Sequence, residues 1–450
     1  MRDNNFITEN NAKHLWHPMG APGDSINNPP KVITKADGSQ ISDIDGHTTV
    51  DAVGGLWCVN LGYSNDAIKE AISEQLYHLP YYSGFAGTTN PAAIEASYMV
   101  TEMFKADGME RVFFTSGGSD SVETCLRLAR QYHRLRGEPT RTKFISLKKG
   151  YHGTHFGGAS VNGNNRFRIA YEPLLPGCFH LPSPYTYRNP FNETDPKKLA
   201  LNIVQAFEDE IAFQDKNTIA AFIMEPIQGA GGVIVPDASF MSLMQEVCDR
   251  NGILMISDEV ITGFGRTGSW SGARHWNVKP DMMSMAKGIT SGYFPVGAAL
   301  MSGKMASVFE NSASSEAGIF HGYTYSAHPV GAAAVCACLS ETQRISTKDN
   351  ASVRGKHLYE GIQRLKKKFD VIGDVRGGQG LMAAIEVVSD PNKKTPMDMN
   401  TMKKLHQKTY EAGAMVRLGL NNILMSPPLV ISEAEIDQIL DALDYGFSSI

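Results

Sequence analysis

Residues 253–268 read Ile-Leu-Met-Ile-Ser-Asp-Glu-Val-Ile-Thr-Gly-Phe-Gly-Arg-Thr-Gly, and residues 280–288 read Pro-Asp-Met-Met-Ser-Met-Ala-Lys-Gly. Each segment holds a short apolar run that ends in polar residues or glycine, which is typical of a buried strand. Lys287 follows the second run, where burying an ammonium is costly unless it is paired or loses its proton. The two segments therefore predict neighbouring strands with Asp258 and Lys287 at their ends.

The alternation of helix and strand extends in both directions from these segments. Short apolar runs predict further strands, and amphipathic segments between some of them predict helices. This alternation favours an α/β fold with a mostly parallel sheet covered on both faces, which binds ligands at the carboxyl ends of its strands. The strands are expected at 111–115, 143–147, 219–225, 253–257, 282–285 and 296–301, and the helices at 67–79, 119–136 and 240–251.

At 450 residues the chain is too long for one ordinary core. Residues 1–60 are rich in Pro, Asn and Gly and are expected to form an N-terminal arm and part of a small domain, with strands at 31–34 and 40–43. Residues 61–330 are expected to form the large domain. Residues 331–450 are expected to form a C-terminal small domain, with helices near 353–367, 402–412 and 433–445.

The composition excludes several classes of function. The chain has 42% hydrophobic and 20% charged residues and a net charge of −5, so it has no field that would attract nucleic acid or anionic lipid. We find no apolar run of membrane-spanning length and no secretory signal at the start. The six cysteines are interpreted as reduced thiols of a cytoplasmic protein.

Three features together predict a cofactor. Gly117-Gly118-Ser119 follows a predicted strand and opens a helix, where backbone N–H groups bind phosphate. A lysine, a carboxylate and a phosphate cradle are the parts of a pyridoxal phosphate (PLP) site, with Lys287 as the Schiff-base amine. Asp258 would keep the pyridine nitrogen protonated. Taken singly, Asp258 would be a strand-end cap and Ser119 a plain helix cap.

Two other readings of these residues are weaker. Gly263-Phe-Gly265-Arg-Thr-Gly268 matches the glycine pattern of dinucleotide-binding proteins, but a loop sequence follows where a long helix would be needed. His152 and His155 are only loosely spaced for a metal, and no carboxylate or cysteine partner is evident. We therefore expect no metal and no dinucleotide, and we expect these histidines to pack or form hydrogen bonds.

The pattern Asp-Glu-Val-x-x-Gly-x-Gly-Arg-x-Gly, followed after about twenty residues by a lysine, resembles the signature of class III aminotransferases. These are fold-type I PLP enzymes that include the ω-transaminases, and the resemblance covers nearly the whole chain. It implies a large domain with a mostly parallel seven-stranded sheet. It also implies a smaller α+β domain built from the N- and C-terminal segments.

The resemblance extends to the cofactor site. It implies that Tyr151 stacks on one face of the PLP ring, that Val260 packs on the other, and that Glu225 lies nearby. Thr324 would reach the phosphate of the neighbouring subunit, which implies a homodimer with its sites at the interface. The family usually has serine where this chain has Gly117. The expected cofactor-binding residues are Gly117, Gly118, Ser119, Tyr151, His152, Glu225, Asp258, Val260, Lys287 and Thr324.

Substrate contacts are implied by the same resemblance. Trp57, in a Gly-Leu-Trp segment, would form an apolar wall with Phe85 and Tyr151. Arg417 would pair with a substrate carboxylate and swing away for an uncharged amine, since guanidinium holds a carboxylate through two parallel bonds. Without the family context, the aromatic residues would be core packing and Arg417 a surface ion pair.

The expected function is a PLP-dependent, ping-pong transfer of an amino group from a primary amine or ω-amino acid to a keto acid, with pyruvate as the expected acceptor. Lys287 would hold the cofactor as an internal aldimine and then carry the proton. The alternatives are a PLP aminomutase or decarboxylase of the same fold, and a non-catalytic PLP-binding protein. The sequence leaves open the donor (ω-amino acid, taurine, diamine or arylalkylamine), the enantiopreference, and whether dimers pair into tetramers.

Overall fold

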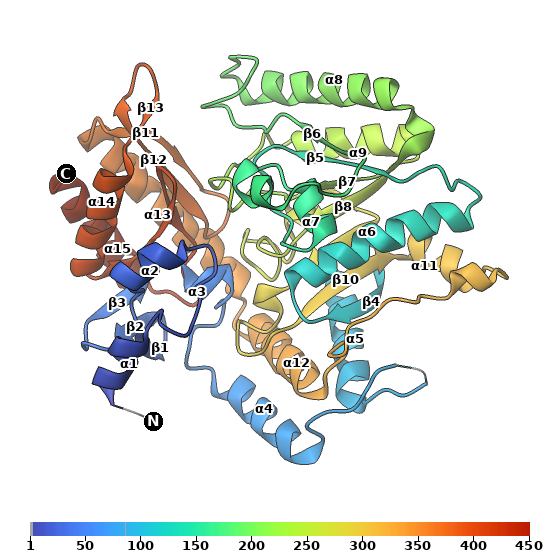
Figure 1. Cartoon of the computed structure of the whole chain (residues 1–450), viewed down its shortest axis with the longest axis horizontal. Coiled ribbons are helices and arrows are strands. Elements are labelled where there is room, and N and C mark those ends of the chain that lie inside the picture. The colour runs from blue at the N-terminus through green and yellow to red at the C-terminus, as the bar shows by residue number, and fades with distance from the viewer. Residues whose placement is uncertain (1–2, 86) are drawn as a thin grey trace.

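The computed structural model describes residues 3–85 and 87–450, and its centre is a seven-stranded sheet (Figure 1). Only β10 runs antiparallel to its neighbours, so the sheet is mostly parallel as expected. In spatial order the strands are β4 (Met109–Thr115), β10 (Gly297–Ser302), β9 (Met282–Met285), β8 (Leu254–Asp258), β7 (Ile219–Met224), β5 (Lys143–Leu147) and β6 (Cys178–Leu181).

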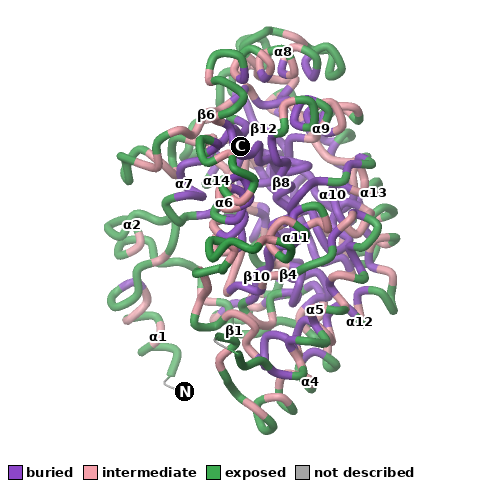
Figure 2. The backbone as a smooth tube through the Cα atoms, turned by 90° about the vertical axis from the view of Figure 1, so that its right-hand side faces the viewer, coloured by how far each residue is buried: buried purple, intermediate pink, exposed green. Residues whose placement is uncertain are grey.

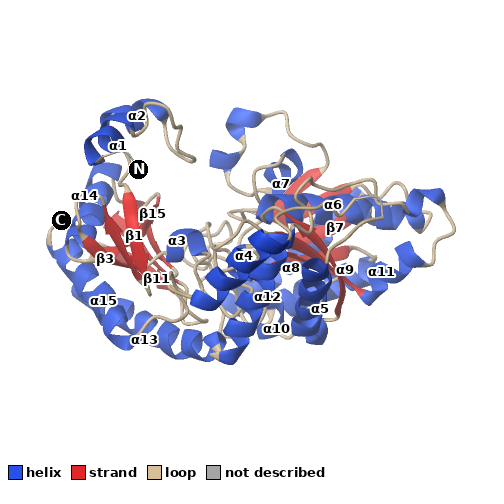
Figure 3. Cartoon of the chain, turned by 90° about the horizontal axis from the view of Figure 1, so that it is seen from below, coloured by secondary structure: helices blue, strands red, loops and turns tan. Residues whose placement is uncertain are grey.

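Helices cover both faces of this sheet (Figure 3), which is why its central strands are continuously apolar. Every residue of β7, β8 and β9 is buried. Side chains of α5 (Pro91–Phe104), α8 (Pro196–Gln214), α9 (Phe240–Asn251) and α12 (Pro329–Arg344) pack in one core with alternate strand residues such as Phe222. Side chains of α6 (Gly118–Leu135), α7 (Phe156–Val161) and α11 (Gly303–Glu310) pack in the opposite core with Ile223.

A smaller α+β region joins the two ends of the chain. A four-stranded sheet places the C-terminal strand β14 (Ala414–Met415) parallel to the N-terminal β3 (Thr48–Asp51). This confirms that N- and C-terminal segments build the smaller unit, while the boundaries at residues 60 and 330 stay predictions. Its other strands are β1 (Ile33–Asp37), β2 (Gln40–Asp43), β11 (Ile372–Arg376), β12 (Ala383–Asp390), β13 (Thr395–Pro396), β15 (Arg417–Gly419) and β16 (Asn422–Met425), and its helices are α13 (Thr347–Lys368), α14 (Met399–Glu411) and α15 (Glu433–Ser448).

The remaining elements are short or peripheral. Buried residues concentrate along the strands, whereas α1 and α2 are largely exposed (Figure 2). Within residues 3–85 and 87–450, no helix combines the length and the apolar character needed to cross a membrane. These elements are α1 (Asn4–Asn10), α2 (Pro22–Asn27), α3 (Gly54–Trp57), α4 (Asp66–His78), α10 (Gly272–His275) and 3₁₀ turns at Lys105–Asp107, Asn165–Phe167, Ile169–Tyr171, Lys216–Thr218, Lys287–Ile289 and Ser315–Ala317.

The glycine-rich segment after β8 is a loop, as the sequence predicted. The next helix, α10, has four residues and starts at Gly272, so no long helix follows to bind a dinucleotide. Arg266 in this loop is fully buried and donates to the carbonyls of Leu381 and Pro427 and to Asn60 Oδ1. The loop therefore connects the edge of the large sheet to the smaller region.

Candidate active site

Lys287 lies at the edge of the large sheet where β8 and β9 end. It starts a 3₁₀ turn with φ +50°, in the left-handed region that L-residues rarely adopt. Burial lowers the pKa of its amine to about 8, and nearby Asp258 opposes this effect. Since a neutral amine is the nucleophile that carbonyl groups require, the position prepares Lys287 for Schiff-base chemistry.

Asp258 is buried at the end of β8 and is paired with a histidine. Its Oδ2 lies 2.7 Å from Nδ1 of His152, which is also buried. The His152 amide donates to Asn162 Oδ1 at 2.5 Å, and Asn162 Nδ2 donates to Gly153 O at 2.8 Å. His152 Nε2 has no partner among the described residues. The prediction that His152 forms a hydrogen bond is confirmed, but its carboxylate partner, Asp258, was not recognised in the sequence; the pair holds the carboxylate in place.

The start of α6 is open and has the features that a phosphate site needs. Gly117 precedes the helix without a side-chain cap, and a Cβ built on it would meet no atom within 4 Å. A Cβ on Gly118 would lie 3.0 Å from Val260 Cγ1, so a larger side chain would crowd the site. Ser119 Oγ accepts from the Thr154 amide at 3.1 Å. The free N–H groups of an 18-residue helix fit a phosphate here.

Glu225 supports the segment that carries Tyr151. Its carboxylate accepts the Tyr151 amide and the Gly229 amide, each at 2.9 Å. Burial raises the pKa of Glu225 to about 7, with a further contribution from Asp258. The Tyr151 ring lies edge-on to Phe167 at 4.9 Å between centroids. Together with the lysine, the anchored carboxylate and the helix start, these residues fit PLP.

One pocket of about 320 Å³ brings together four of the residues singled out in the sequence: Trp57, Tyr151, Lys287 and Arg417. Trp57 is almost fully buried, with φ +63°, at the end of α3. Arg417 is half-buried on β15, and its guanidinium makes no hydrogen bond or ion pair with the described residues. An unpaired, desolvated guanidinium facing a pocket can bind a carboxylate.

Several pocket residues were missed by the sequence analysis. Ile261 and Leu56 lie next to residues that were recognised, and Lys149 and Arg166 add positive charge to the wall. Asn162, which orients the His152 segment, carries no motif of its own. Ile261, Leu56 and Lys149 could have been found from recognised residues nearby in the chain, whereas Arg166 and Asn162 approach the site only through folding.

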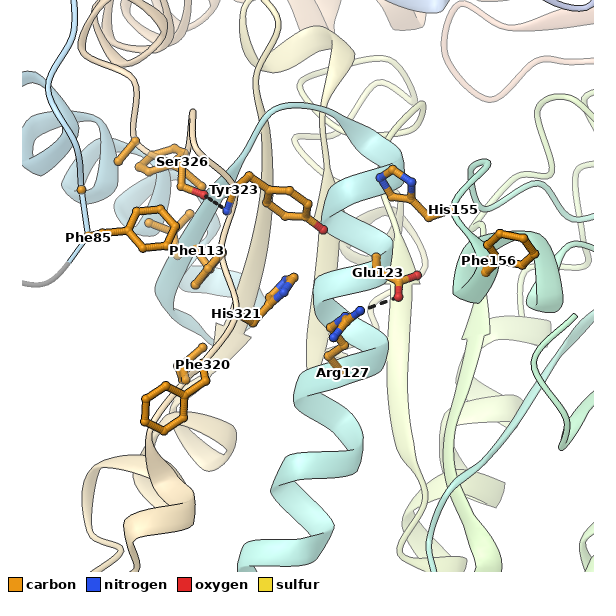
Figure 4. Close-up of a pocket in the computed structure, with 16 residues that line it drawn as sticks. Phe85, Phe113, Glu123, Arg127, His155, Phe156, Phe320, His321, Tyr323 and Ser326 are labelled. Atoms are coloured by element: carbon orange, nitrogen blue, oxygen red, sulfur yellow. Dashed lines mark hydrogen bonds and ion pairs between the residues drawn. The ribbon is translucent and has the colours of Figure 1, made fainter.

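Phe85 and Thr324 lie outside the substrate pocket in the folded chain. Phe85 is 48% exposed and lines a separate pocket of about 1200 Å³ with Phe320 and Tyr323 (Figure 4). Thr324 is exposed, and its carbonyl accepts from the Tyr81 hydroxyl at 2.8 Å. Within one chain, the structure therefore does not bring Phe85 to the wall formed by Trp57 and Tyr151, nor Thr324 to the substrate pocket.

Comparisons with known proteins find similar sequences and structures among the aminotransferases. The chain is 34% identical over 437 residues to an omega-aminotransferase of Caulobacter vibrioides, covering 96% of this chain and 97% of that protein. It is 34% identical over 419 residues to the putrescine–pyruvate aminotransferase of Pseudomonas aeruginosa, covering 91% and 89%. A solved amine transaminase from an uncultivated Pseudomonas species, in its PLP-bound internal aldimine form, has a TM-score of 0.95 and 44% identity, with 97% and 98% of the two chains covered.

A family model also spans almost the whole chain. The model for class III aminotransferases matches residues 23–445. The fold, with its seven-stranded sheet and smaller terminal region, is that of fold-type I PLP enzymes, as the resemblance implied. The enzyme's cofactor is accordingly PLP. The chain belongs to the class III aminotransferases, the PLP-dependent transaminases.

Proposed function

We propose that this aminotransferase moves the amino group of a primary amine or ω-amino acid to pyruvate. The observation that carries the proposal is the shared pocket in which Lys287, Trp57, Tyr151 and the unpaired Arg417 meet. An apolar aromatic wall suits the carbon chain of an amine, and Arg417 suits the carboxylate of a keto acid. Donor and acceptor would use this one pocket in turn, as a ping-pong reaction requires.

The residues would divide the work as follows. Gly118 and Ser119 at the start of α6 would hold the PLP phosphate, and Asp258, held by His152, would keep the pyridine nitrogen protonated. When bound, PLP supplies the electron sink for the transfer. Lys287 would anchor the cofactor and move the substrate proton, because its lowered pKa leaves much of the amine neutral.

We further propose that the enzyme is a homodimer whose subunits complete one another's sites. Large apolar side chains gather at the surface around Phe85: Phe320 is 96% exposed and Phe156 67% exposed, and both line the same pocket. A monomer seldom leaves such a patch uncovered. A partner subunit would cover it and would bring Phe85 and Thr324 to the neighbouring site. The six cysteines are all free, which supports action in a reducing compartment such as the cytoplasm.

The proposal is tested with a panel of amines and ω-amino acids, with pyruvate as acceptor and alanine formation as the readout. Lys287→Ala is expected to abolish both the turnover and the yellow colour of bound PLP. Lys69→Ala, on the exposed face of α4, is the control and should retain both. Turnover that persists without Lys287 would overturn the assignment. Release of carbon dioxide from the donor would instead indicate a decarboxylase.

A further inference from the structure

A cluster of charged side chains, Lys149, Arg188 and Glu386, lines the part of the substrate pocket that we call its outer end. None of the three is among the main charged groups that shift the pKa of Lys287. Glu386 on β12 lines the pocket, and its Oε1 accepts from Arg188 Nε at 2.6 Å. Arg376 on β11 donates to Asp374 Oδ2 at 2.7 Å. Each arginine thus has a carboxylate partner of its own. Both oxygens of Glu386 are occupied, since Oε2 accepts from the Tyr185 hydroxyl and from Arg376.

Lys149 is the positively charged residue of this cluster that has no carboxylate partner among the described residues. Its Nζ makes no hydrogen bond or ion pair with any residue in the described ranges, and lies 5.1 Å from the centre of the Tyr185 ring. The side chain is half-buried and lines the pocket. Burial lowers its pKa, and Glu386 offsets this only in part. A desolvated ammonium with no acceptor leaves room for an anion from outside the chain.

Two glycines, Gly229 and Gly231, lie between Trp57 and Lys149 along one segment of the chain. A Cβ on Gly229 would lie 2.6 Å from Ile261 and 3.5 Å from Trp57. A Cβ on Gly231 would lie 3.1 Å from the Cβ of Lys149. Gly229 and Gly231 are two residues apart, and two residues of extended chain span at most about 7 Å. Lys149 therefore lies close to the aromatic wall formed by Trp57. Arg417 lines the same pocket, and its charge helps to lower the pKa of Lys287.

We propose that Lys149 is a second anion-binding residue, which holds the distal carboxylate of straight-chain ω-amino acid donors too long for Arg417 to serve. The proposal rests on the proposed function and refines its substrate class. Arg417 would take the carboxylate of pyruvate and of short donors, while the outer end of the pocket takes that of longer ones. Gly229 and Gly231 allow the chain to pass close to Ile261, Trp57 and Lys149, and Ala230 between them lines the pocket with only a methyl group.

Lys149→Met tests this, because methionine keeps the unbranched shape and most of the length of the side chain and removes its charge. Lys148→Met is the matched control, since Lys148 is the exposed neighbour in the chain. Both variants are assayed with ω-amino acids of three to seven carbons and with the unsubstituted alkylamines of the same lengths. We expect kcat/KM of Lys149→Met to fall about tenfold or more for the longest acids, as for the loss of a charged hydrogen bond.

The same variant should leave β-alanine and all the alkylamines unchanged, and Lys149→Arg should restore the long acids. An equal fall for every donor, alkylamines included, would show a structural role and overturn the proposal, as would unchanged kinetics with the long acids. Binding of hexanoate, measured by calorimetry with Arg417 replaced by Leu in both proteins, needs no turnover: the protein with Lys149 should bind it and the protein with Lys149→Met should not. Equal binding by both proteins also overturns the proposal. Binding of hexanoate that depends on Lys149, together with a wild type that transaminates no donor, refutes only the proposed function.

Discussion

At the scale of single residues, two opposing effects set the pKa of Lys287. Burial lowers its pKa to about 8, and the charge of Asp258 is the largest opposing influence. In protein stripped of PLP, labelling of Lys287 by an amine-reactive reagent should therefore rise with a midpoint near pH 8. Asp258→Asn should move the midpoint lower, because it removes the stabilising charge. Mass spectrometry of the labelled peptide measures both, and a midpoint near that of an ordinary lysine would contradict the prediction.

Glu225 links the site to the stability of the fold. Burial raises its pKa from 4.5 to about 7, so the unfolded chain ionises at a lower pH than the folded one. The folded state therefore loses stability as pH rises from 4.5 to about 7. Glu225→Gln removes this loss but disturbs the bond from the Gly229 amide. We compare the free energies of unfolding of the variant and the wild type by denaturant titration. The difference should favour the variant by about 3 kcal/mol more above pH 7 than near pH 4.5.

The control for this comparison is Glu74→Gln, on the exposed surface of α4. Its stability relative to the wild type should stay nearly constant over the same pH range. A constant difference for Glu225→Gln as well would show that the buried carboxyl ionises as readily in the folded chain as in the unfolded one.

Residues in a contiguous motif could be predicted from the sequence, and residues placed by folding could not. Lys287 and Asp258 follow apolar runs that mark strand ends, so their meeting at one sheet edge follows from the strand pattern. Asn162 lies in a segment without a motif, and Lys149 lies two residues before Tyr151 but in no pattern that marks an anion site. Their contacts with His152 and with the outer pocket depend on how the segment after β5 crosses the site.

At the scale of elements, the same distinction separates the central strands from the edges. The predictions at 143–147 and 282–285 match β5 and β9 residue for residue, since continuous burial requires a continuous apolar run. The edge strand β6 was missed: its four residues include His180, and three of the four are only half-buried. The pairing of β14 with β3 joins opposite ends of the chain and leaves no local signal.

Helix α13 packs against the smaller sheet region through a glycine. A Cβ on Gly355 would lie 1.9 Å from the carbonyl oxygen of Gly380, whose φ is +65°. Alanine is normally about 1 kcal/mol better than glycine inside a helix. Here the clash should reverse the sign, and Gly355→Ala should destabilise the fold by about 2 kcal/mol or more.

The midpoint of denaturant unfolding measures this effect. Gly23→Ala is the control, because Gly23 lies in α2 and a Cβ there meets no atom within 4 Å. That variant should be as stable as the wild type or slightly more so. A Gly355→Ala variant that matches the control would mean that α13 can move away from Gly380 at little cost.

At the scale of the whole molecule, one chain holds Lys287, Asp258, the helix start and Arg417, but Phe85 lines a separate pocket and Thr324 is exposed away from the substrate pocket. The resemblance to the family implied that Thr324 acts across a subunit boundary, whereas Phe85 was expected beside Trp57. Sequence spacing does not distinguish a contact within a chain from one between copies. That distinction depends on which apolar surface the folded chain leaves exposed.

Phe320 is the most exposed large side chain on that surface, at 96%. If a second copy covers it, Phe320→Asp would bury an unpaired carboxylate at the interface, and the dimer should dissociate. Light scattering should then find a monomer, and amino transfer should fall because Phe85 and Thr324 no longer reach a neighbouring site. Phe213→Asp is the control: Phe213 is 85% exposed on α8 and does not line this pocket. A Phe320→Asp protein that stays dimeric and fully active would place the subunit interface on another face.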